Sequence, residues 1–142
     1  RFSKLRFRTE FLNAGEDYLF WMELVRAGAR AAFSTRIEAT YGRGVNVYSA
    51  SGWGSDQFAL RVHNEMKYRK STLQLFELNV EQRAFVESSL RPLRRAFAAD
   101  LVHRVLHRKP LQRELIRAHW SLDASTFAQV PRVLLGKLSG RP

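Results

Sequence analysis

Apolar residues recur every three or four positions along most of the chain after Gln57, which is the period of an amphipathic α-helix. The first such stretch follows Ser55 and Asp56, two residue types that commonly cap a helix start. Its apolar positions are Phe58, Val62, Met66, Leu73 and Phe76. The pattern predicts a helix from about residue 57 with one face packed against a core.

Polar residues and prolines divide the rest of this half into further helices. Asn79 and Gln82 have the spacing of a capping box, in which each side chain bonds the backbone N–H of the other. Pro92 suits the first turn of a new helix, and Pro110 and Pro131 predict two shorter ones. We expect the following basic residues on outward faces: Arg94, Arg95, Arg104, Arg108 and Lys109.

The first third of the chain has a different pattern. Residues 16–27 are too apolar to face water all round, so they predict a largely buried helix that stops at Gly28. Residues 31–41 alternate in polarity with a period of two, as a half-buried strand does. A glycine- and serine-rich loop follows at 42–54. A helix followed by a strand indicates the α/β class. This unit would be half of an α/β layer, without the strands that should lie beside it.

Charge and composition narrow the classes of partner. The chain has a net charge of +11, and residues 58–142 hold 16 Lys or Arg against 7 Asp or Glu. This excess predicts an anionic partner such as phospholipid, nucleic acid or a phosphorylated substrate, with a solvated basic surface as the alternative. The absence of cysteine excludes disulfides and thiolate chemistry. No apolar run is long enough to span a membrane.

Two adjacent carboxylates, Glu16 and Asp17, stand at the predicted start of the first helix, directly after Gly15. Backbone N–H groups and the helix dipole stabilise negative charge there. A carboxylate held on a rigid element at the edge of a core is suited to act as a general base. The alternative is an ordinary helix start with acidic residues in its first turn.

The residues around this pair carry a resemblance. A segment Phe7–Leu12 precedes Gly15-Glu16-Asp17, a small-Gly pair (Ala27-Gly28) ends the helix, and Tyr41-Gly42-Arg43 closes the predicted strand. This order resembles the second half of the catalytic domain of family-2 inverting glycosyltransferases of the GT-A fold. The resemblance implies a partial GT-A, Rossmann-like α/β half at residues 1–56 and a basic helical extension at 57–142. It also implies that the chain is a piece of a longer protein.

In that family Asp17 matches the catalytic base, and Glu16 the neighbour that orients the acceptor. Arg43 matches the basic position facing the donor diphosphate, and Tyr18 and Trp53 are candidate sugar platforms, as is Trp21. Asn46 stands near the position where many members have a metal-binding His, so we assign it to substrate and assign no residue to metal. The family's divalent cation, Mg²⁺ or Mn²⁺, would be held mostly by an Asp-x-Asp motif that this chain lacks.

The resemblance further implies the substrates of the enzyme and its location in the cell. The donor would be a nucleotide sugar and the acceptor a glycan or lipid-linked hydroxyl, in bacterial polysaccharide or cell-surface glycan synthesis. The enzyme would be cytoplasmic, in peripheral contact with the anionic inner face of the membrane. The main alternative is a basic helical module that binds nucleic acid or acts as a scaffold, although no known nucleic-acid motif occurs. His103 and His107, four residues apart, could chelate a metal but have no third ligand in sequence.

Overall fold

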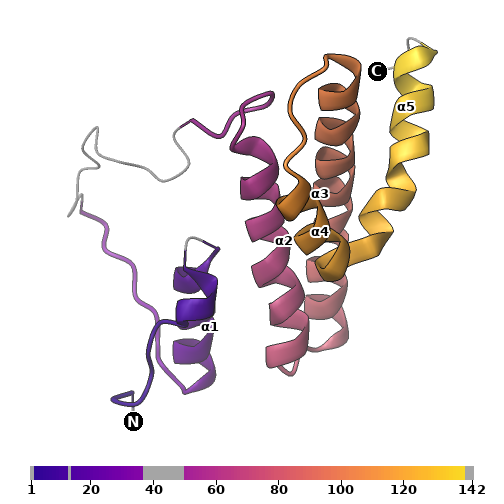
Figure 1. Ribbon diagram of the computed structural model, residues 1–142. Coiled ribbons are helices and arrows are strands. Elements are labelled where there is room, and N and C mark those ends of the chain that lie inside the picture. The colour runs from indigo at the N-terminus through magenta and orange to yellow at the C-terminus, as the bar shows by residue number, and fades with distance from the viewer. Residues whose placement is uncertain (1, 13, 37–49, 140–142) are drawn as a thin grey trace.

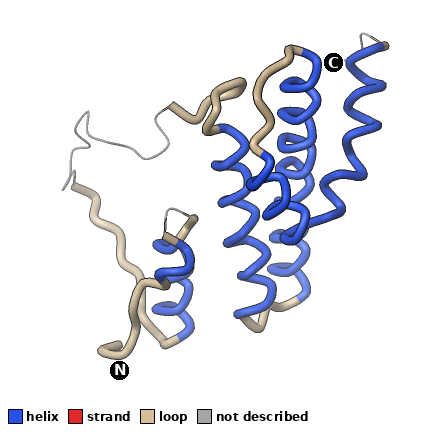
Figure 2. Tube along the Cα trace, viewed as in Figure 1, coloured by secondary structure: helices blue, strands red, loops and turns tan. Residues whose placement is uncertain are grey.

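The computed structural model describes residues 2–12, 14–36 and 50–139. These residues form helices and connecting loops, with no strand among them (Figures 1 and 2). The elements in chain order are a 3-10 turn η1 (Thr9–Phe11), α1 (Glu16–Arg26), α2 (Phe58–Leu75), α3 (Val80–Leu106), α4 (Arg113–Asp123), a 3-10 segment η2 (Ala124–Gln129) and α5 (Val130–Leu138).

The helices α2 and α3 form an antiparallel hairpin that organises the molecule (Figure 1). The capping box predicted at Asn79 and Gln82 is present, since each side chain bonds the other residue's backbone N–H at 2.8 and 3.0 Å. Phe58, Val62 and Phe97 are buried between the two helices. Leu115 of α4 and Phe127 of η2 pack against this cluster. The last helix, α5, then lies alongside α3 and runs in the same direction (Figure 1). The residues after Gln57 are therefore helical, as the apolar period predicts.

The helix α1 packs on the far end of α2 through a smaller apolar cluster. Phe11, Ala14 and Leu19 are buried there together with Phe76, which ends α2. Gly28 adopts φ +87° and, with Ala29, donates to the carbonyls of Val25 and Leu24, which is a Schellman motif that ends the helix. The prediction of a helix over residues 16–27 is confirmed to within one residue.

The α1 helix is less buried than its composition predicts. Only Leu19 is fully enclosed, whereas Trp21 and Val25 are 63% and 62% exposed. The reason is that α1 meets the rest of the described chain mainly along one face, on α2. The opposite face has no helix against it in the described part of the chain.

The α/β prediction is wrong for the residues the structure describes. Residues 31–36 of the expected strand form no strand, and residues 37–41 lie outside the described ranges. A strand exists only where a neighbouring strand accepts its backbone hydrogen bonds, and no such neighbour occurs in the described part of the chain. Phe33, on the predicted buried face, is 96% exposed. The alternation of apolar and polar residues is therefore not sufficient to form a strand over residues 31–36.

Pro92 does not begin a helix but lies inside α3, which continues through it. Proline removes one backbone donor and normally disrupts a helix interior. Here α3 is held along its length by α2 and α5, and Arg69 Nη1 of α2 donates to the Ser89 carbonyl 3.2 Å away, in the turn before Pro92. Tertiary packing thus overrides the local signal of Pro92.

The two later prolines differ from each other. Pro131 does lie in the first turn of α5, whereas α4 begins at Arg113, three residues after Pro110.

Candidate functional site

The two candidate carboxylates stand where the sequence predicts, in the first turn of α1. Gly15 precedes them at φ +88°, a left-handed conformation that L side chains resist. Asp17 is exposed and Glu16 is partly buried. Asp17 Oδ1 accepts a hydrogen bond from the Tyr18 backbone N–H at 2.9 Å. Its other oxygen, Oδ2, makes no hydrogen bond to any described residue, so it is available to a hydroxyl from solvent.

Tyr18 and Trp21 lie beside these carboxylates on the exposed side of α1. Tyr18 stacks on Tyr68 of α2 with ring centroids 5.3 Å apart, yet remains 59% exposed. Tyr18 and Trp21 line a groove of about 490 Å³ between α1 and the turn that joins α2 to α3. Phe76 and Leu78 form its apolar side, and an exposed aromatic face next to an apolar groove is a surface on which a sugar ring can stack.

The groove also contains polar residues that sequence reasoning did not select. Glu77 and Gln82 line it from the turn and from the first turn of α3, and Arg26 lines it from the end of α1. Arg26 Nη1 donates to the Leu75 carbonyl at 3.1 Å, which ties α1 to the end of α2. Glu77 follows directly after the apolar end of α2, but no local pattern in the sequence places it in the same groove as Trp21.

Trp53 does not join this site. Its ring packs edge-on against Phe58, with centroids 5.0 Å apart, and lies 5.7 Å from the His103 ring. Tyr68, which contacts α1, is ten residues further along α2 than Phe58, or about 15 Å at the rise of an α-helix. The structure therefore separates Trp53 from Asp17 along the length of α2. Arg43 and Asn46 lie outside the described residues.

One basic residue expected on the surface is buried. Arg104 is only 2% exposed and bonds Asp100, one helical turn earlier, through Nε at 2.7 Å. Its other nitrogens donate to Asp56 and to the carbonyls of Ser55 and Pro110. Arg104 therefore ties the loop before α2 and the loop after α3 to the core. It is a structural residue and not part of a solvent-facing basic surface.

A histidine pair, of which His119 is buried and His63 partly buried, forms a second polar cluster in the helical body. His119 of α4 stacks on Phe97 at 3.6 Å, and its Nδ1 lies 3.1 Å from Nδ1 of His63 in α2. Its Nε2 lies 3.0 Å from Thr126 Oγ1. Burial, together with the neighbouring His63, lowers the pKa of His119 to about 4, and burial also lowers the pKa of His63. Both rings are therefore neutral at pH 7, one donating to the other.

The described residues provide no group of three or more His, Cys, Asp or Glu side chains that could hold a metal. Glu16 and Asp17 share one helical turn without a third ligand, and the rings of His103 and His107, 4.3 Å apart, also lack one. The described residues therefore hold no complete metal site, and the resemblance puts most ligands of its Mg²⁺ or Mn²⁺ in an Asp-x-Asp motif outside this chain.

No protein-family model, curated protein or solved structure matches the chain. None of the helices in the described ranges is both long and apolar enough to cross a bilayer.

Proposed function

We propose that this chain carries the acceptor-activating residues of an inverting glycosyltransferase that acts from a nucleotide-sugar donor, within a longer protein. One observation supports it most. The exposed Asp17 carboxylate stands in the first turn of α1 next to Tyr18, which together with Trp21 lines the aromatic groove, although Asp17 itself does not line it. A sugar acceptor needs both features, because a ring face must be held while one of its hydroxyls meets a base.

Asp17 takes the proton of the acceptor hydroxyl as that oxygen attacks the anomeric carbon of the donor sugar. The bond from this carbon to the nucleotide diphosphate breaks on the opposite side, so the configuration at the carbon inverts. The hydrogen bond from the Tyr18 backbone N–H holds one oxygen of Asp17 and leaves Oδ2 for the proton. Glu16, on the same turn, orients the acceptor. No step is assigned to a cation, because the described residues offer it no site.

The test is transfer activity of the complete protein with UDP- and GDP-sugar donors. Asp17→Asn should lower turnover by about 10²–10⁴-fold, the usual contribution of a general base, and leave the KM for the donor unchanged. Glu114→Gln, which removes one exposed carboxylate from α4, is the matched control and should keep wild-type turnover. Near-normal transfer by Asp17→Asn would exclude Asp17 as the base, and no transfer by the wild type would overturn the proposed activity.

The groove makes a separate prediction for the acceptor. Trp21→Ala should raise the KM for the acceptor with a smaller change in turnover, because it removes a stacking surface and no proton-transfer group. Trp53→Ala should leave the acceptor KM unchanged, since Trp53 packs beside Phe58 and His103. Equal effects of the two substitutions would mean that the groove on α1 does not hold the acceptor.

We further place the protein in the cytoplasm, in peripheral contact with an anionic membrane surface through its basic helices. The support is the excess of nine positive charges in residues 58–142. Each Lys or Arg near such a surface contributes about 1 kcal/mol at most, so a few suffice for reversible binding. Vesicle sedimentation should show binding to anionic but not neutral lipid, lost at high salt. Binding that survives high salt would contradict it.

A second candidate is a basic helical module that binds nucleic acid, and the helical character of the described residues favours it. It predicts salt-sensitive binding of DNA or RNA that Asp17→Asn leaves unchanged. Transfer activity lost in Asp17→Asn would favour the glycosyltransferase over this candidate.

A further inference from the structure

A cleft of about 370 Å³ lies between α3 and α5, on the opposite side of the α2–α3 hairpin from α1 (Figure 1). Three basic side chains line it: Arg95 from α3, and Arg132 and Lys137 from α5. Between them the lining is small or apolar, formed in part by Ala99 and Gly136. Its volume is within the range of about 300–1,000 Å³ found for small-molecule sites.

No acidic side chain in the described ranges neutralises the positive charge in this cleft, since none of the described Asp or Glu residues lines it. Among the described residues, none of the three basic groups has a hydrogen-bond or salt-bridge partner in the structure. The nearby carboxylates are used elsewhere, since Asp123 pairs with Arg94 and Lys70, and Asp100 pairs with Arg104. Three cations around one cleft raise the local positive potential, which favours the binding of an anion there.

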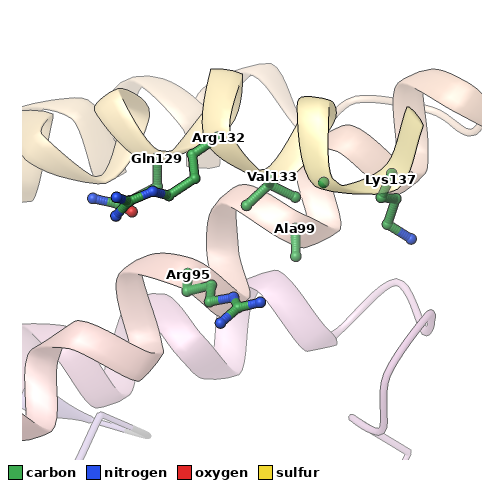
Figure 3. A pocket seen from close by; sticks show the side chains of 7 residues that line it. Arg95, Ala99, Gln129, Arg132, Val133 and Lys137 are labelled. Atoms are coloured by element: carbon green, nitrogen blue, oxygen red, sulfur yellow. The ribbon is translucent and has the colours of Figure 1, made fainter. Parts of the chain in front are cut away.

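The arrangement of the side chains indicates what kind of anion fits. Figure 3 shows Arg132 beside Gln129 at one end and Lys137 at the other, with Val133 and Ala99 between them. Arg132 and Lys137 are five residues apart on one helix, about 7.5 Å along its axis. A guanidinium matches two phosphate oxygens at once, whereas an ammonium acts as a point charge. A ligand with two anionic groups can contact Arg132 with one group and Lys137 with the other, which a single anionic group does less well.

We infer that the cleft between α3 and α5 binds a ligand that carries two linked phosphate groups, held by Arg95, Arg132 and Lys137. The Gln129 amide, at the Arg132 end, adds a neutral donor for an ester or bridging oxygen. The ligand is either a free diphosphate or the diphosphate head of a lipid, since both present the same chemistry to the cleft. The inference stands apart from the proposed glycosyl transfer, because it uses none of the residues of α1.

The test is calorimetric titration of the 142-residue chain with inorganic pyrophosphate and with inorganic phosphate. Pyrophosphate should bind saturably and more tightly than phosphate. Arg95→Gln, Arg132→Gln and Lys137→Gln should each weaken it about tenfold or more, which corresponds to the loss of one charge-assisted contact. All three side chains are exposed, so circular dichroism should remain that of the wild type.

Arg83→Gln is the matched control. Arg83 is exposed on α3, twelve residues or about 18 Å before Arg95, and its substitution lowers the net charge by the same unit. It should leave pyrophosphate affinity within about twofold of the wild type. Equal weakening by all four substitutions would show that only net charge matters and would overturn the site, as would the absence of saturable pyrophosphate binding.

Vesicles distinguish the two sources of the ligand. The chain is sedimented with vesicles of neutral lipid alone and of neutral lipid doped with a lipid diphosphate. Binding to the doped vesicles that pyrophosphate displaces, and that Arg132→Gln loses while Arg83→Gln retains, supports the site with a lipid as the source. Saturable pyrophosphate binding without a difference between the vesicles supports it with a free diphosphate.

Discussion

The ring of Tyr68 occupies the space that a side chain on Gly15 would need. A Cβ built on Gly15 would lie 2.5 Å from Tyr68 Cδ1 and 2.7 Å from Cγ, and Gly15 also has φ +88°. Glycine is required here for two reasons, a left-handed backbone and a close approach of the α1 start to α2. The contact fixes the turn that carries Glu16 and Asp17 against the body of the protein.

Gly15→Ala should therefore loosen α1 from α2. The left-handed conformation alone costs an L residue about 1–2 kcal/mol, and the clash with Tyr68 adds to it. Gly54→Ala is a matched control, since Gly54 has φ +80° but its nearest neighbour is Lys109 Nζ at 4.0 Å. Hydrogen exchange in α1 should accelerate in Gly15→Ala and not in Gly54→Ala. If Tyr68→Ala fails to reduce the effect of Gly15→Ala, the close approach is not its cause.

The elements that the sequence predicts well are those defined by neighbouring residues. The bounds of α1 follow from Gly15 and Gly28, and the start of α3 from the Asn79–Gln82 capping box. The helices in residues 58–138 follow from apolar residues that recur every three or four positions, which places them on one face of each helix. Each of these signals acts within a few residues, so no knowledge of the tertiary structure is needed.

The failures concern partners that are distant in sequence. A strand at 31–41 needs a neighbouring strand, and alternation cannot say whether one exists. The burial of Arg104 does not follow from the sequence, although Asp100 stands one turn earlier, because Asp56 and Pro110 complete its contacts from outside α3. At the candidate site, sequence places Asp17 and Tyr18 on one helix start. It could not predict that Glu77 lines the groove with Tyr18 and Trp21, or that Trp53 lies elsewhere.

Pro92 gives a prediction about stability. An interior proline costs a helix about 3 kcal/mol relative to alanine, part of which the stiffer unfolded chain offsets. Pro92→Ala should thus raise the free energy of unfolding by about 1–2 kcal/mol, measured by urea denaturation. Pro131→Ala is the control, because Pro131 lies in the first turn of α5, where proline is tolerated. A gain in Pro92→Ala no larger than in Pro131→Ala would mean that α3 is already relaxed around the proline.

The buried histidine pair predicts acid sensitivity. His119 has a pKa lowered to about 4 in the folded protein, whereas an unfolded histidine has about 6.5. The unfolded chain therefore takes up the proton first, and the stability contributed by neutral His119 is full above about pH 6.5 and is lost as pH falls towards 4. His63, Lys70 and Asp123 face this ring, and the lowered pKa of His63 acts in the same direction.

Denaturation at several pH values checks this. The free energy of unfolding should fall between pH 6.5 and 4 in the wild type and in His107→Gln, which changes an exposed histidine. His119→Gln should be less stable at pH 7, because it loses the stack on Phe97, but its stability should depend less on pH. A proton NMR titration that gives His119 a pKa near 6.5 would contradict the buried pair.

The last prediction compares two ion pairs with the same spacing and different burial. Asp100 and Arg104 are four residues apart in α3, with side chains 1% and 2% exposed and a contact of 2.7 Å. Arg61 and Glu65 are four apart in α2, with side chains 35% and 30% exposed and a contact of 3.5 Å, and Glu65 also pairs with Arg69 at 3.6 Å. Removing Asp100 takes away the buried counter-ion of Arg104 and leaves it only Asp56, whose side chain is 84% exposed. Loss of one partner of a buried pair costs about 3–5 kcal/mol. An exposed pair contributes about 1 kcal/mol or less.

Asp100→Ala should thus lower the free energy of unfolding by several kcal/mol, and Glu65→Ala by at most about 1 kcal/mol. The double variant Asp100→Leu/Arg104→Met should recover much of the loss, since it removes the stranded charge and fills the space. Its recovery should be incomplete, because Arg104 also bonds the carbonyls of Ser55 and Pro110, which then lose their donor. Urea denaturation of the four proteins measures these differences. If Asp100→Ala costs no more than Glu65→Ala, solvent reaches Arg104 and the pair does not lock the two loops to the core.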